Sequence, residues 1–276
     1  MRNKIIISFC AIFFIFSHQV SAAIGAVSTA TGGSGRGAVE PVDGVFLNPA
    51  MISDLSKKNF SFNYSAEQWG LAIVDNGADS YFPAALTLVR TDTSALDTQQ
   101  VGLSIASARW QRISLGVTAS MYEYVNLGAG NIEQKYRQGV FDAGLTFAIT
   151  PNFGFGIVGK KINSSKIDLA ENLQAQKTTA AGISYTYQKF ARVRLDVETA
   201  PDNKTDRLVY MAGLENYVND WLVFRIGYQN NNVIDKDYIT AGAGFSGPQF
   251  GLHYAFISNT STKAEDKHLV DLTVPF

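Results

Sequence analysis

Apolar and polar residues alternate along most of the chain, from about residue 59 to the C-terminus. Residues 193–198 read VRLDVE and residues 222–229 read LVFRIGYQ, so large apolar side chains occupy every second position. A period of two places successive side chains on opposite faces of a β-strand. We therefore predict an all-β chain whose strands have one apolar face and one polar face.

Fourteen alternating segments can be counted, and many are about ten residues long, as a tilted strand must be to cross a bilayer. Their first residues lie near Asn59, Trp69, Phe82, Gln99, Ile113, Tyr136, Phe153, Thr178, Ala191, Leu208, Trp221, Tyr238, Gln249 and Lys267. Alternation alone also fits a soluble β-sandwich with its core on one side, so the links between the segments must decide.

Those links are of two kinds. From the fourth segment onward every second link is only two residues long, at 111–112, 151–152, 188–189, 219–220 and 247–248. The links between them are longer and polar, at 126–135, 163–177, 230–237 and 258–266. Short turns at one end and longer loops at the other are typical of outer-membrane barrels, whereas a sandwich has no reason to sort its links. We predict an antiparallel transmembrane β-barrel of about fourteen strands.

The last strand and the aromatic residues near the short links also indicate an outer-membrane barrel. The chain ends in alternating residues up to Phe276, which resembles the C-terminal strand that the bacterial outer-membrane assembly machinery recognises. That machinery and outer-membrane lipid are the partners expected on this basis. Aromatic residues near the short links would form an interface girdle; they are Trp110, Phe153, Phe190, Trp221 and Phe250.

The N-terminus is typical of a secretory signal peptide. Arg2 and Lys4 precede an apolar run over 5–16, and Val20-Ser21-Ala22 supplies the small residues for cleavage before Ala23. The apolar run is short for a membrane anchor. Cleavage would remove the single cysteine and change the formal net charge from −1 to −3. We expect export to the outer membrane and no binding of nucleic acid.

Residues 23–58 contain no convincing strand and are rich in small residues at first, before the tripeptide Asn48-Pro49-Ala50. We predict three parts: a signal peptide at 1–22, a plug or hatch at 23–58, and a barrel at 59–276. Inward-facing glycines would leave room for the plug. The glycines assigned to this face are 139, 144, 154, 156, 227, 242 and 244.

Charged residues within the strands are assigned to the lumen, because a charge facing lipid costs a few kcal/mol (about 2–4 at the midplane). The assigned residues are Asp142, Lys160, Arg192, Arg194, Asp196, Glu198, Glu215 and Arg225. They would form either a network that pairs across strands and with the plug, or a polar path for a ligand.

A specific anchor for the plug follows from these charges. Glu40 and Asp43 precede the Asn-Pro-Ala tripeptide, and three of the lumen arginines (192, 194 and 225) lie near short links. We hypothesise that at least one of Glu40 and Asp43 pairs with this arginine cluster, with Glu215 as the competing partner.

Enzyme chemistry finds little support in the sequence. The mature chain would keep His253, assigned to the lumen, and His268, assigned to the lipid face or the outer interface; neither has the spaced partners of a metal site. No Gly-x-Ser-x-Gly motif is present, although a membrane-embedded lipase could place a serine beside His253. Residues 242–247 match the sequence of a dinucleotide-binding pattern but not its structural context, since a strand is expected after them instead of a helix. No cofactor, metal or enzyme activity is expected.

Two stretches carry a family resemblance. Residues 35–40 and 45–50 resemble the start of the FadL/TodX family of outer-membrane transporters, and residues 214–228 look like its late hairpin, which PorV-type secretion barrels share. The resemblance implies a fourteen-stranded barrel around an N-terminal plug, with Asn48, Pro49 and Ala50 as the hatch turn. It implies passage of long-chain fatty acids or aromatic hydrocarbons. The alternative is a structural or docking barrel that binds a partner protein and transports nothing.

Overall fold

The computed structural model describes residues 25–37, 43–93, 96–127, 133–170, 173–199, 207–261 and 266–276. The predicted signal peptide and Glu40 lie outside these ranges. None of the helices within them is long and apolar enough to cross a membrane.

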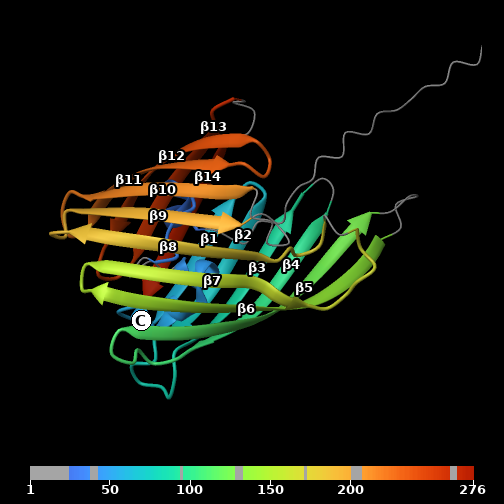
Figure 1. Ribbon diagram of the computed structural model, residues 1–276, viewed down its shortest axis with the longest axis horizontal. Helices are drawn as coiled ribbons and strands as arrows, with labels where there is room; N and C mark the ends of the chain where they lie inside the picture. The colour runs from blue at the N-terminus through green and yellow to red at the C-terminus, as the bar shows by residue number, and fades with distance from the viewer. Residues whose placement is uncertain are drawn as a thin grey trace, which may run out of the picture.

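Fourteen strands form one closed antiparallel barrel, in which β1 pairs with both β2 and β14 (Figure 1). The strands are β1 (Asn59–Ser65), β2 (Gln68–Asp75), β3 (Ala84–Asp92), β4 (Asp97–Ala106), β5 (Ile113–Leu127), β6 (Glu133–Thr150), β7 (Phe153–Ser164), β8 (Thr178–Tyr187), β9 (Ala191–Thr199), β10 (Leu208–Tyr217), β11 (Leu222–Asn231), β12 (Lys236–Ser246), β13 (Gly251–Asn259) and β14 (Lys267–Pro275). The predicted fold class is confirmed, and every predicted strand start lies within three residues of the observed one.

The links from β6 onward largely keep the predicted sorting. Short turns join β6 to β7, β8 to β9, β10 to β11 and β12 to β13 at one end, which we call the short-turn end. The long link from β7 to β8 lies at the opposite, long-loop end. Two links differ from the prediction: β11 and β12 extend toward each other and leave a short link, whereas β4 and β5 are separated by 107–112.

The strands expose their apolar face and bury their polar face, which is the reverse of the arrangement in a soluble β-protein. In β9 the apolar Leu195 is 48% exposed, while the neighbouring Arg194 is fully buried; in β11 Ile226 is 60% exposed and Arg225 only 6%. The apolar side chains therefore point away from the barrel and the charged ones into it. This arrangement suits a barrel with lipid outside and a polar lumen.

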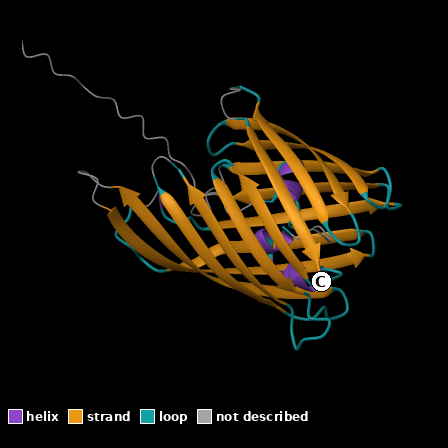
Figure 2. Ribbon diagram, turned by 180° about the vertical axis from the view of Figure 1, so that it is seen from behind, coloured by secondary structure: helices purple, strands orange, loops and turns teal. Residues whose placement is uncertain are grey.

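The first described residues lie inside the barrel (Figure 2). They include the short helix α1 (Ala26–Ala30), the single helical turn α2 (Gly44–Leu47) and the 3₁₀ helix η1 (Pro49–Asp54). We call residues 25–37 and 43–58 the N-terminal segment. Its helices contact opposite parts of the wall: α1 packs on strands β11 to β14, and η1 packs on β4 to β6.

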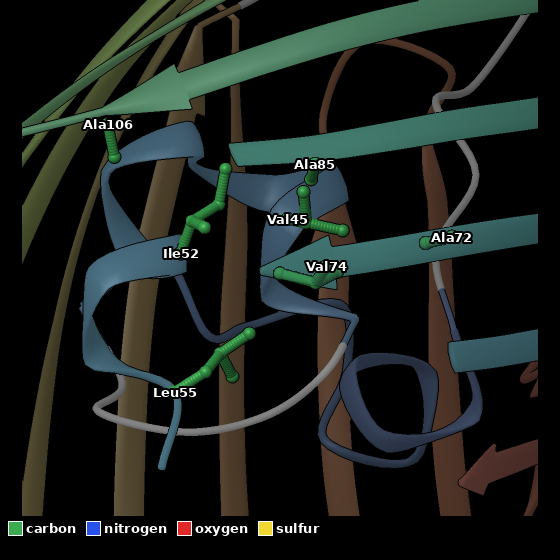
Figure 3. Close-up of a cluster of buried hydrophobic side chains, with 7 residues drawn as sticks. All are labelled: Val45, Ile52, Leu55, Ala72, Val74, Ala85 and Ala106. Carbon is green, nitrogen blue, oxygen red and sulfur yellow. The ribbon is translucent and has the colours of Figure 1, made fainter. Parts of the chain in front are cut away.

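An apolar cluster secures the second half of the N-terminal segment (Figure 3). Val45, Ile52 and Leu55 from this segment pack against small residues that β2, β3 and β4 point inward. The wall residues are Ala72, Val74, Ala85 and Ala106. Burial of each large aliphatic side chain contributes about 1.5–3 kcal/mol, so this cluster is a substantial part of what holds the segment inside.

Glycines in the wall make the close approach possible. A Cβ on Gly144 would lie 2.0 Å from Asn48 Oδ1, and a Cβ on Gly156 would lie 1.9 Å from the carbonyl oxygen of Arg36. No side chain fits at such distances. The lumen assignment of Gly139 is wrong, because Gly139 shares the parity of Phe141, whose side chain faces outward and is 54% exposed. A Cβ there would meet nothing within 4 Å.

Candidate functional site

The N-terminal segment is fastened to the wall through Arg36. Its guanidinium Nη1 lies 3.1 Å from Asp196 Oδ2 in β9, and its Nη2 contacts Glu198 on the same strand. The backbone N–H groups of Gly35 and Arg36 each donate to the same Asp196 oxygen at 2.9 Å. Burial opposes the charge of Arg36, but the carboxylates of Glu198 and Asp196 outweigh it, and the pKa of Arg36 lies above its ordinary value. Arg36 therefore stays charged.

The three arginines predicted to face the lumen all contact one carboxylate, that of Glu215. Glu215 in β10 lies between β9 and β11 and is 1% exposed. Arg192 Nη1 is 3.6 Å from Glu215 Oε1, Arg194 Nη2 contacts the same oxygen, and Arg225 Nε is 3.0 Å from Oε2. This agrees with the interpretation of the lumen charges as a network across neighbouring strands.

The hypothesised anchor through Asp43 is wrong. Asp43 Oδ2 accepts hydrogen bonds from Ser28 N at 2.7 Å and from Ser28 Oγ at 2.5 Å. Among the described residues Asp43 forms no ion pair with an arginine. Glu215 is the partner because strand pairing sets it directly opposite Arg192 and Arg225, whereas Asp43 borders the same cavity but is bound to Ser28. The Glu40 part of the hypothesis lies outside the described residues.

The Asn48-Pro49-Ala50 tripeptide joins both halves of the N-terminal segment to the wall. Asn48 Oδ1 accepts from Ala50 N at 3.1 Å, and Pro49 begins η1. Asn48 Nδ2 donates to the carbonyl oxygens of Arg36 and of Leu145 in β6, both at 3.2 Å. One fully buried amide thus connects residue 36, the turn at 48–50 and the barrel.

A bulge in β7 adds further charged side chains to the lumen, between the N-terminal segment and the long-loop end. The β6–β7 register shifts between Phe141 and Ala143, and Lys161 adopts a positive φ of 56°. The bulge turns two consecutive lysines, Lys160 and Lys161, into the barrel, where each is 7% exposed. Lys161 N donates to Asp142 Oδ1 at 2.6 Å. Parity assigned Lys160 correctly but gave no indication of Lys161, because a bulge interrupts the period of two.

The long-loop end is narrowed by the β7–β8 link. Leu169 and Ala175 from this link are buried against Tyr122 and Tyr124. Ala175 N donates to the Tyr124 hydroxyl at 3.0 Å, and that hydroxyl donates to Gln138 Oε1 at 2.8 Å. The aliphatic side chains of this loop therefore point into the barrel mouth.

A cavity of about 370 Å³ lies at the short-turn end between the N-terminal segment and the wall. It is bordered by apolar side chains of the segment and by charged side chains of β9 to β14. His253 lies there, with its Nδ1 3.3 Å from Arg225 Nη1. His268 instead contacts the Tyr254 hydroxyl at 2.7 Å on the exposed side. Within the described ranges no group of three or more His, Cys, Asp or Glu residues could hold a metal ion.

Comparison with known proteins gives agreement in structure only. No family model and no curated protein matches the sequence. Among solved structures, the CymD monoaromatic hydrocarbon channel has a TM-score of 0.72 at 14% identity, covering 92% of this chain and 98% of that one. The toluene transporter TbuX of Ralstonia pickettii has a TM-score of 0.68 at 13% identity, with 92% and 99% covered.

A FadL homologue of Pseudomonas aeruginosa has a TM-score of 0.61 at 10% identity, with 92% and 98% covered. The chain therefore has the fold of FadL/TodX-type transporters, as the sequence resemblance implied. These neighbours are described as channels and transporters.

Proposed function

We propose that this protein is an exported outer-membrane channel for small hydrophobic molecules of the hydrocarbon or long-chain fatty acid class. The observation that carries the proposal is a barrel whose interior holds its own N-terminal segment, in a fold shared with a monoaromatic hydrocarbon channel and a toluene transporter. We infer that this segment acts as a plug. Passage through such a barrel needs no bond to be made or broken, and we assign no catalytic residue.

Placement in the outer membrane is supported by the wall. Its outward side chains are predominantly apolar, and large aromatic residues are exposed near the short-turn end, where an interface girdle is expected. These residues are Trp110, Phe190, Trp221 and Phe250. Export would use residues 1–22, and assembly would use the strand that ends at Phe276.

Residues that hold the plug would control passage. The Arg36 contacts with Asp196 and Glu198 and the amide contacts of Asn48 are polar and reversible. Lys160, Lys161 and the β7–β8 link narrow the lumen above the plug. We infer that a passenger crosses only after the plug shifts within the barrel.

A reversible tether tests this function directly. Ser53 Oγ in η1 lies 2.7 Å from Ser114 Oγ in β5, so a Ser53→Cys/Ser114→Cys variant can form a disulfide between plug and wall. Removal of residues 1–22 leaves no native cysteine to interfere. Uptake of labelled toluene and palmitate is measured in vesicles with a lipopolysaccharide outer leaflet, with arabinose as the polar comparison.

We expect wild-type barrels to admit the hydrophobic solutes several-fold faster than protein-free vesicles. The oxidised double variant should lose this uptake and regain it on reduction, while each single cysteine variant behaves as wild type. Wild-type uptake no faster than in protein-free vesicles would overturn the proposal. Recovery of one stoichiometric periplasmic protein with such an inactive barrel would favour a docking role.

A further inference from the structure

Two buried carboxylates beside α1 lack a cationic partner. Asp43 and Asp271, the latter in β14, are each 5% exposed. Asp271 Oδ2 accepts from Ala26 N at 2.5 Å, as Asp43 Oδ2 does from Ser28 N at 2.7 Å. The second oxygen of each carboxylate, Oδ1, is buried without a hydrogen-bond partner. Neither carboxylate forms an ion pair with any described residue.

The two carboxylates lie close together. The position of a Cβ on Gly25 is 2.7 Å from Asp271 Oδ2 and 3.0 Å from Asp43 Oδ2. Two ionised carboxylates at such separation repel each other, and burial removes the water that would screen them. The wall arginines that act on these carboxylates, Arg194 and Arg225, are already bound to Glu215. His253 stands opposite Asp271 on β13. A shared proton or a bound cation is needed to stabilise the pair.

Both carboxylates border the cavity of about 370 Å³ at the short-turn end. Ser61 in β1 borders the same cavity, and its Oγ is buried without a hydrogen-bond partner. Val27, Phe46 and Leu55 supply apolar surface. Three residues that border the cavity thus each hold a buried oxygen without a hydrogen-bond partner. The cavity also has a surface that suits carbon, and its size is within the range of small-molecule sites.

We propose that this cavity binds a primary ammonium group, with Asp43 and Asp271 as its principal acceptors and Ser61 as the third. An ammonium carries one positive charge and three N–H donors, which match the two carboxylates and the hydroxyl. A metal ion fits less well, because no group of three or more His, Cys, Asp or Glu among the described residues could hold one, and the main structural metals need several such ligands. The site lies beside the proposed passage and does not depend on it.

Two sources can supply this group. One is a free primary amine that enters from the short-turn end. The other is the chain's own α-amino group, which hydrolysis of the 22–23 peptide bond by a signal peptidase would create on Ala23, two residues before Gly25. Two residues span at most about 7 Å, and the Cβ position of Gly25 lies within 3.0 Å of both carboxylates. The chemistry is the same in both cases, and the experiment separates them.

The first arm is calorimetric titration of the intact, processed barrel in detergent with benzylamine, and with benzyl alcohol as the neutral isostere. If a free amine is the ligand, benzylamine binds saturably and benzyl alcohol does not. Asp271→Asn then weakens benzylamine binding at least tenfold, since the amide keeps an acceptor for Ala26 but loses the charge. Asp220→Asn is the matched control, because Asp220 borders the same cavity but is exposed.

The second arm measures acylation of the α-amine by an amine-reactive ester in the native and the unfolded barrel. If the chain's own ammonium occupies the site, native acylation is at least tenfold slower, benzylamine does not bind, and Asp271→Asn removes the protection. Asp43→Asn replaces Asp271→Asn should the latter fail to assemble. Overturning the proposal requires a native α-amine as reactive as the unfolded one together with no difference between benzylamine and benzyl alcohol. The carboxylates would then share a proton.

Discussion

Arg36 is the only basic side chain between Ala23 and Lys57, and it forms two ion pairs between the N-terminal segment and strand β9. Sequence reasoning identified Asp196 and Glu198 as lumen carboxylates but assigned the plug the acidic partner instead of the basic one. The isolated arginine among small residues was an available signal. Its partners could not be inferred, because they lie about 160 residues away in sequence, and neither spacing nor periodicity connects them.

Replacement of Arg36 tests its role as the fastening residue. Arg36→Gln removes the cation that pairs with the buried Asp196 and the partly buried Glu198. Such a loss costs up to about 3–5 kcal/mol in a dry site and less in a hydrated lumen. We expect several-fold greater leakage of small solutes through reconstituted barrels, with Arg36→Lys intermediate, because lysine lacks the planar fork.

The control is Arg90→Gln, which removes an exposed arginine paired with Asp92. It should leave leakage unchanged. Equal leakage from Arg36→Gln and wild type would show that Arg36 does not hold the segment.

Glu215 is the second residue whose charge we test, because it pairs with three arginines. Glu215→Gln would strand Arg192, Arg194 and Arg225 around a neutral amide. We expect the thermal unfolding midpoint to fall by roughly 5–10 °C, since about 1 kcal/mol shifts a chain of this size by about 2–4 °C and lumen hydration moderates the loss. Heat-modifiable migration on gels measures it. Glu123→Gln, at an exposed pair with Arg137, should change the midpoint little, and a similar fall in both variants would contradict a special role for Glu215.

At the scale of elements, the strands were predictable and their irregularities were not. Alternation located all fourteen strands because lipid-facing and lumen-facing positions must differ in polarity along each one. The bulge at Lys160 and Lys161 could not be predicted, since it is an extra stretch of β7 relative to β6. The inward folding of the β7–β8 link was also missed, because its few aliphatic residues form no periodic pattern.

The fit between the N-terminal segment and the wall can be tested at one glycine. Gly144→Leu would place a side chain where Asn48 Oδ1 now lies, 2.0 Å from the Cβ position. We expect the turn at 48–50 to be displaced and residues 43–58 to become cleavable by protease in the membrane-embedded barrel. Mass spectrometry of the released peptides measures this.

Gly139→Leu is the matched control, because it adds the same side chain to β6 on the outward face, where nothing lies within 4 Å. Its N-terminal segment should stay protected. Full protection in Gly144→Leu would show that the wall yields at this point and that the glycine is not required for the fit.

At the scale of the whole molecule, closure of the barrel joins its first and last strands. β1 pairs with β14 along seven residue pairs, and Phe276 N donates to Lys58 O at 3.0 Å. We predict that Phe276→Lys sharply lowers the amount of heat-modifiable barrel in the outer-membrane fraction, because the terminal aromatic residue is the expected recognition feature for assembly.

Phe250→Lys separates this effect from the simple loss of an exposed aromatic residue at the short-turn end. It should assemble better than Phe276→Lys. Unchanged levels for Phe276→Lys, or equal losses for the two variants, would contradict recognition through the terminus.

The pairing of β1 with β14 also has a kinetic consequence. Asp271 binds Ala26 across 245 residues of sequence, so this contact forms only when nearly the whole chain is available. Contacts between sequence-distant residues slow folding, because loop-closure entropy is lost before they form. The wall encloses the N-terminal segment once the seam has closed. The segment can therefore enter from the side only while β1 and β14 are still apart. The order of these two events then decides whether it is enclosed directly or must enter through an end of the finished barrel.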